Sequence, residues 1–153
     1  MSHHRSTVRW RRREGEAFAD GRYSRVHAWR FDGGAEIGAS ASPDVVPPPF
    51  SSAELVDPEE AFVASLSSCH MLWYLSIAAK RGFVVDAYED DAEGTMARDG
   101  RGRMSITRVV LTPRVAYAGL APDRATEEAM HHEAHERCFI ANSVRTEIEV
   151  RVP

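Results

Sequence analysis

Two cysteines are the residues in this chain whose chemistry is most distinctive. Cys69 lies in the segment SLSSCHMLW, and Cys138 lies in HERCFIAN, 69 residues further along the chain. A thiolate attacks electrophiles, binds soft metals and forms disulfides, whereas a protonated, buried thiol packs as a small apolar group. The two cysteines are therefore redox partners, metal ligands or inert core residues, and their separation in sequence does not decide among the three.

The surroundings of Cys69 argue against a purely structural role. Ser67, Ser68 and His70 surround it in an otherwise apolar segment, where polar side chains need hydrogen-bond partners. We do not assign His70 as the base that activates the thiol, because successive residues of a helix point about 100° apart. Cys138 lies at a predicted helix end just before the final strand, where the backbone moves at low cost.

A metal site is the third hypothesis for these residues. His131, His135 and Cys138 are spaced at i, i+4 and i+7, which places them on one helix face, and zinc accepts nitrogen and sulfur ligands. The motif supplies only three ligands from one helix, and His132-Glu133-Ala134-His135 is one residue shorter than the H-E-x-x-H pattern. The pattern favours a polar, histidine-rich helix face.

One well-marked helix must position Cys69. Asp57 suits the N-cap with Glu60 three residues later, Pro58 suits the first turn, and Gly82 suits the position after the last turn. These signals predict a helix from residue 58 to about 81. Apolar residues lie on several of its faces, so we expect a central helix that is buried nearly all round. The main apolar face carries Phe62, Leu66, Cys69, Trp73 and Ile77.

Strands make up most of the remaining chain. Alternation and turn residues predict strands over 5–12, 22–31, 35–39, 83–97, 103–115 and 144–152. Turns are predicted at Asp32-Gly33-Gly34 and near Asp99-Gly100, and four prolines make residues 40–56 irregular. A second helix runs from residue 122 to about 137. Because helices and strands do not alternate regularly, we predict an α+β fold with one domain over residues 1–153.

Composition narrows the class of protein further. The chain has 153 residues, of which 43% are apolar, and a net charge of −4 argues against a nucleic-acid partner. No apolar segment follows the charged N-terminus, so we expect no signal peptide. The longest strongly apolar stretch, residues 71–79, is too short to span a bilayer. We therefore expect a cytoplasmic protein without a membrane partner, whose thiols are normally kept reduced.

The segments that contain the two cysteines resemble the OsmC/Ohr family, the osmotically inducible and organic hydroperoxide resistance proteins. The first match is Asp57-Pro58-Glu59-Glu60 followed by an alanine- and serine-rich helix into Cys69; the second is Ala134-His135-Glu136-Arg137-Cys138 before a last strand. Glu59 lies ten residues before Cys69, as the family pattern requires. Strand order and length also fit, so the resemblance covers essentially the whole chain. It implies an intertwined homodimer in which antiparallel sheets wrap two central helices.

The resemblance also implies a reaction. Cys69 would reduce an organic hydroperoxide to its alcohol and become a sulfenic acid, which Cys138 would capture as an intramolecular disulfide for a dithiol reductant to reopen. Glu59 and an arginine would complete the site, with Arg25 the first candidate and Arg30 the second. The resemblance implies neither a cofactor nor a metal.

The predicted substrate contacts are apolar. Phe62, Met71 and Trp73 lie close in sequence to Cys69 and would bind an alkyl tail, although each also fits as a core residue. Ten residues of helix span about 15 Å, so Glu59 and Cys69 of one chain cannot touch if the helix is continuous. We therefore expect a composite site at the homodimer interface. The alternative is a non-catalytic, dimeric small-molecule-binding protein with structural cysteines.

Overall fold

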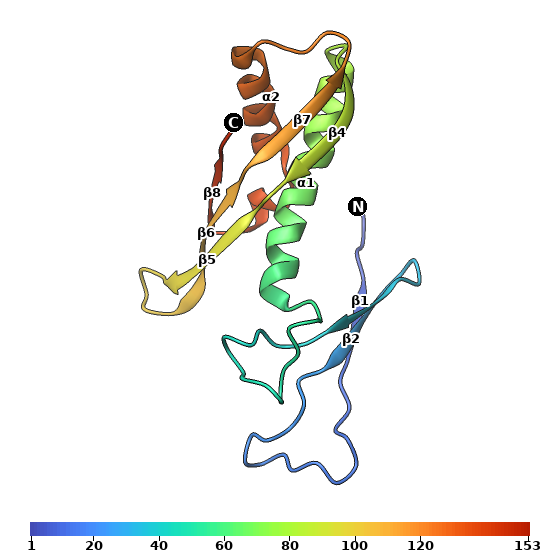
Figure 1. The fold of residues 1–153 in the computed structure, drawn as a ribbon, viewed down its shortest axis with the longest axis vertical. Coiled ribbons are helices and arrows are strands. Elements are labelled where there is room, and N and C mark those ends of the chain that lie inside the picture. The colour runs from blue at the N-terminus through green and yellow to red at the C-terminus, as the bar shows by residue number, and fades with distance from the viewer. The chain divides into compact units, whose positions relative to one another are not determined.

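A computed structural model describes residues 1–153 and confirms the α+β class (Figure 1). The chain divides into two compact units, Met1–Ala61 and Phe62–Pro153. Helix α1 (Pro58–Lys80) begins at the end of the first unit and supplies the central helix of the second. Both cysteines belong to the second unit.

The first unit contains a three-stranded antiparallel sheet in the order β1 (Ser6–Arg9), β2 (His27–Phe31) and β3 (Glu36–Ala39). The predicted turn at residues 32–34 is confirmed, because the Phe31 N–H donates to the Ala35 carbonyl at 2.9 Å. Strand β2 starts five residues later than predicted. Backbone N–H groups before it bond elsewhere: that of Ser24 donates to the Glu16 carboxylate at 2.6 Å, and that of Arg25 donates to the Phe50 carbonyl at 2.8 Å.

Both predicted ends of α1 are confirmed. At its start, the Glu60 N–H donates to the Asp57 carboxylate at 2.7 Å, and the Asp57 N–H donates to the Glu60 carboxylate at 3.1 Å. This reciprocal pair satisfies two backbone donors that a helix start leaves free. At its end, Gly82 has a φ of 81°, and the Phe83 N–H reaches back to the Ala78 carbonyl at 3.0 Å. A residue with a side chain is strained at that φ, which is why glycine suits the position.

The second unit contains two sheets. Strands β4 (Val84–Asp90) and β7 (Pro113–Ala118) form an antiparallel pair, and the other sheet has the order β5 (Glu93–Arg98), β6 (Met104–Leu111), β8 (Glu147–Val150). Each of the two long strands predicted over 83–97 and 103–115 is therefore interrupted. The Asp90 carboxylate accepts the Thr112 N–H at 2.6 Å, which takes that donor out of the strand ladder.

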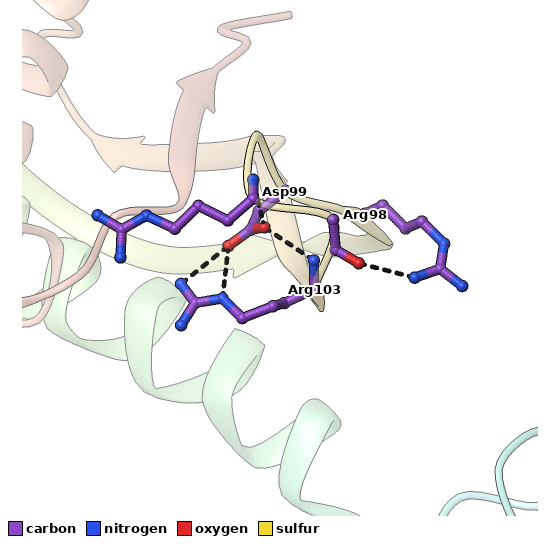
Figure 2. A network of polar contacts seen from close by, with 5 residues as sticks. Arg98, Asp99 and Arg103 are labelled. Carbon is purple, nitrogen blue, oxygen red and sulfur yellow. Dashed lines mark hydrogen bonds and ion pairs between the residues drawn. The ribbon is translucent and has the colours of Figure 1, made fainter.

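The predicted turn near Asp99-Gly100 joins β5 to β6. The Asp99 carboxylate accepts the backbone N–H groups of Arg101 and Arg103, at 2.8 and 2.9 Å, and also pairs with the Arg103 guanidinium (Figure 2). In the same turn the Arg98 guanidinium, labelled in Figure 2, donates to the Gly102 carbonyl at 2.7 Å. Strand β8 pairs with β6 in parallel and is shorter than the predicted 144–152 segment.

Helix α2 (Arg124–Arg137) confirms the second predicted helix and lies beside α1 in the second unit (Figure 1). Asp123 caps it by accepting the Thr126 N–H at 2.8 Å, and a short 3-10 helix, η1 (Ala141–Ser143), follows it. One core cluster joins the two helices, and a second joins α1 to β6. The buried members are Tyr74, Ile77, Ala78, Met130 and Ala134 in the first cluster, and Leu66, Val109 and Leu111 in the second.

The expectation that α1 is buried nearly all round is wrong for this chain, because the Leu72 side chain is 61% exposed. The most buried positions are Leu66, His70, Tyr74, Ile77 and Ala78, a stripe that includes two polar residues. By length and composition α1 is also long and apolar enough to cross a membrane. Its buried stripe packs against α2 and the strands.

Candidate functional site

The structure brings the two cysteine side chains together. Cys69 lies on α1, and Cys138 is the residue that caps the end of α2. Both are free thiols and lie near each other: Cys69 lines one cavity with Phe139, the residue after Cys138, and it helps to raise the pKa of Cys138. Cys69 and Cys138 are 69 positions apart in sequence. They are neighbours because α1 and α2 pack side by side and because α2 ends next to the middle of α1.

The two thiols lie in different environments. Cys138 is 1% exposed, and its sulfur accepts the Ala141 N–H at 3.4 Å. Burial, with a smaller contribution from the neighbouring Cys69, raises the pKa of the Cys138 thiol to about 11. Cys138 therefore holds its proton at neutral pH. Cys69 is only half-buried and borders a cavity, so a small molecule can reach its sulfur.

A cavity of about 280 Å³ opens beside Cys69. Four other side chains line it, and three of them are apolar: Leu72, Trp73, Ser76 and Phe139. The sequence pointed to Trp73 but not to Phe139, whose ring is 69% exposed. Phe139 directly follows Cys138 in sequence. This position assigns Phe139 to the site only if Cys138 is already known to lie near Cys69.

The other two predicted substrate contacts lie elsewhere. Phe62 lines a separate cavity of about 680 Å³, together with residues of the β5–β6 hairpin and the segment that leads into β8. Met71 is half-buried and is not among the residues that line the cavity beside Cys69. Of the three predicted contacts, the structure therefore brings only Trp73 together with the candidate nucleophile.

Arg25 and Glu59 belong to the first unit. The Arg25 guanidinium donates to the carbonyls of Gly21, at 2.7 Å, and of Tyr23, and it lies 3.7 Å from the centre of the Tyr23 ring. Glu59 is half-buried in the first turn of α1. Because α1 is continuous, Glu59 and Cys69 are about 15 Å apart along its axis. Their roles at the site stay predictions.

A buried histidine pair joins α1 to α2 next to the thiols. His70 Nε2 lies 3.0 Å from His131 Nδ1, with the ring planes 3° apart, and the His131 ring also stacks on Tyr74 at 4.0 Å. His70 and His131 are 1% and 2% exposed. Burial lowers the pKa of His70 to about 3, with a contribution from the charges of His131 and His135, and burial lowers the pKa of His131 to about 4. Both rings are therefore neutral at pH 7.

The geometry does not support the metal hypothesis. No three histidine, cysteine, aspartate or glutamate side chains lie in an arrangement that holds a metal ion. His131 instead bonds His70, so it does not join His135 and Cys138 in a ligand set. Two polar residues near Cys69 have partners: the Ser67 hydroxyl donates to the Asp90 carboxylate, and His70 bonds His131 through Nε2.

These features define the chain as a small α+β protein with two neighbouring free thiols, one of which faces an apolar cavity. Residues 51–152 match the model of the OsmC-like protein family. The chain belongs to this family, and the resemblance drawn from the sequence is confirmed.

Solved structures give the same result. An OsmC-like protein of unknown function from Vibrio cholerae is 54% identical, with a TM-score of 0.98 and full coverage of both chains. An organic hydroperoxide resistance protein from Elizabethkingia anophelis is 17% identical, with a TM-score of 0.68 over 99% of this chain and 94% of that one. The organic hydroperoxide resistance protein OhrB of Bacillus subtilis is 16% identical, with a TM-score of 0.66 over 99% and 98%. No curated protein sequence matches the chain.

Proposed function

We propose that this protein is a thiol-dependent peroxidase that reduces organic hydroperoxides, with Cys69 as the attacking thiol and Cys138 as the resolving thiol. The observation that carries the proposal is the proximity of the two thiols in the second unit: Cys69 and Phe139, the residue after Cys138, line one cavity, and Cys69 contributes to the raised pKa of Cys138. Two proteins that share the fold, from Elizabethkingia anophelis and Bacillus subtilis, are organic hydroperoxide resistance proteins.

The proposed reaction has three steps. The Cys69 thiolate attacks the terminal peroxide oxygen, the O–O bond breaks, and the alkoxide leaves as an alcohol after it takes a proton. Cys69 is then a sulfenic acid. The Cys138 sulfur attacks the Cys69 sulfur, hydroxide leaves as water, and a disulfide forms. A dithiol reductant reopens this disulfide by thiol exchange and is itself oxidised.

Exposure decides the order of the two thiols. Cys69 borders the cavity, whereas Cys138 is buried and keeps its proton at neutral pH. A hydroperoxide therefore meets Cys69 first, and Cys138 acts once a sulfenic acid lies beside it. The apolar side chains of Leu72, Trp73 and Phe139 provide a surface for an alkyl or aryl group.

We further propose that Arg25 and Glu59 complete this site in a cytoplasmic homodimer. A guanidinium holds a thiolate charged and stabilises the leaving alkoxide, and a carboxylate orients the guanidinium. Since Glu59 and Cys69 lie about 15 Å apart on one helix, we assign Glu59 to the site of the partner chain. The loss of turnover in a monomeric variant that keeps its fold is the expected consequence.

The test is anaerobic stopped-flow reaction of the reduced protein with cumene hydroperoxide. We expect the Cys69→Ser variant to have no activity and the Cys138→Ser variant to react once and stop at the sulfenic acid. His132→Gln, on the exposed face of α2, is the matched control and should turn over as the parent protein does. Full turnover by Cys69→Ser would reject the proposal.

A non-catalytic protein that binds a small apolar molecule is the second candidate. The cavity beside Cys69 is small and mostly apolar, and the buried Cys138 thiol resembles a structural cysteine. Titration with a disulfide reagent separates the two functions. A peroxidase should show one fast and one slow thiol, whereas a binding protein should show two slow thiols.

A further inference from the structure

Trp73 lies at the junction of the two segments that carry the thiols. It follows Cys69 by four residues on α1, so the two side chains lie on the same helix face, one turn apart. Its ring meets the Phe139 ring edge-on, with the ring centres 5.4 Å apart and the planes at 80°. The Arg137 guanidinium lies 5.6 Å from the centre of the same indole ring.

The two residues that Trp73 contacts are the two neighbours of Cys138 in sequence. One indole ring on the Cys69 helix therefore holds the Cys138 segment on both sides of its thiol. The helix α2 ends at Arg137 and the backbone at Cys138 is extended, while Ile140 and Ala141 pack against the cluster that contains Leu66 of α1. The Cys138 sulfur and carbonyl accept hydrogen bonds from within the segment, from the N–H groups of Ala141 and Asn142.

We propose that Trp73 is a positioning residue for the resolving thiol, which holds Cys138 where its sulfur can bond to that of Cys69. The proposal concerns the same thiol pair as the proposed function. It rests on that function only in calling Cys138 the resolving thiol. Both thiols are free and the Cys138 segment lies beside Cys69, so Trp73 holds the two thiols near each other before a disulfide forms. Loosening the Cys138 segment would lower the local concentration of its thiol at Cys69.

The expected size of the effect follows from the two contacts. An edge-to-face aromatic pair and a cation–π contact together are worth a change of about tenfold in an equilibrium constant. Trp73→Leu removes both contacts, Trp73→Phe keeps an aromatic ring for Phe139, and Arg137→Gln removes only the cation. We expect the equilibrium constant for forming the Cys69–Cys138 disulfide to fall about tenfold in Trp73→Leu and about threefold in Arg137→Gln. Trp73→Phe should lower it by an intermediate factor.

The experiment is equilibration of the full-length protein with glutathione and glutathione disulfide, followed by alkylation and mass spectrometry. In this exchange both thiols lose a proton and one electron each to form the disulfide, and one glutathione disulfide becomes two glutathione molecules. The constant of this equilibrium measures the effective concentration of one thiol at the other and requires no peroxide. Arg124→Gln, at the opposite end of α2, is the matched control and should leave the constant unchanged.

The outcomes separate the inference from the proposed function. A lowered constant in the Trp73 and Arg137 variants supports the positioning role even if the protein reduces no hydroperoxide. An unchanged constant in Arg137→Gln and Trp73→Phe overturns it, and so does a parent protein whose cysteines form no disulfide. Arg137 is half-exposed, so its variant decides the matter if Trp73→Leu does not fold.

Discussion

The buried pair of His70 and His131 makes the stability of the protein depend on pH in a way that can be calculated. An unfolded histidine has a pKa of about 6.5, whereas the folded protein holds these two at about 3 and about 4. At a pH between the folded and the unfolded pKa values, the two histidines bind protons only in the unfolded chain. The stabilisation is therefore fully present above about pH 6.5 and is lost as the pH falls toward the pKa values of the folded protein.

The magnitude follows from the width of this window. Each pH unit below 6.5 costs about 1.4 kcal/mol per histidine, so at pH 5 each ring has lost about 2 kcal/mol and the pair about 4 kcal/mol. Carboxylates contribute little above pH 5, and those of Asp99, Asp123 and Glu149 have pKa values lowered by their hydrogen bonds. A loss of about 4 kcal/mol is a large part of the 5–15 kcal/mol that stabilises a typical domain.

The assay is urea unfolding, followed by circular dichroism, at intervals between pH 7.5 and pH 5. The double variant His70→Leu/His131→Leu replaces both members of the pair by apolar residues and leaves no buried nitrogen unpaired. We expect it to lose most of the pH dependence, whereas His132→Gln, an exposed neighbour, should keep it. A parent protein equally stable at pH 7.5 and pH 5, or a double variant with the same slope, would refute the reasoning.

Two further predictions test the packing and the start of α1. Gly94→Ala should destabilise the fold by about 1–3 kcal/mol, because its Cβ would lie 2.6 Å from the Val63 side chain, and adding Val63→Ala should restore most of the loss in urea unfolding. Asp57→Ala should cost about 1 kcal/mol because it removes the carboxylate that caps α1, while Asp57→Asn should cost less. Unchanged unfolding midpoints in the two alanine variants would contradict these assignments.

The ends of the helices and the tight turns could be predicted from sequence because their signals are local. Asp57 and Gly82 mark the ends of α1 by side-chain capping and by backbone freedom, and both act on residues within one turn. The strand interruptions could not be predicted in this way. They depend on the Asp90 carboxylate, which reaches a backbone N–H 22 residues away, and on the parallel pairing of β8 with β6, for which the sequence holds no local signal.

The buried face of α1 was misjudged for a related reason. Apolar periodicity correctly selected Leu66 and Ile77. The other buried positions of the stripe include His70 and Tyr74, which it did not select. Polar residues can occupy a core when their polar atoms pair with one another, as His70 does with His131. Such a pair joins residues 61 positions apart in sequence, so the pattern of a single helix cannot reveal it.

The candidate site, like the fold, could be predicted from the sequence only in part. The residue types and the resemblance at both cysteines pointed to Cys69 and Cys138, and the structure places their thiols near each other. Phe139 and the contacts of Trp73 emerge only from the packing of α2 on α1. The places of Arg25 and Glu59 remain predictions, because both residues belong to the other compact unit.

The most direct test of the central claim is the mass of the reduced protein after reaction with one equivalent of an organic hydroperoxide. The proposed function predicts a product two hydrogen atoms lighter, with the tryptic peptides of Cys69 and Cys138 joined by a disulfide within one chain. A product that instead carries an added oxygen on Cys69, or that joins two chains through Cys69, would contradict it.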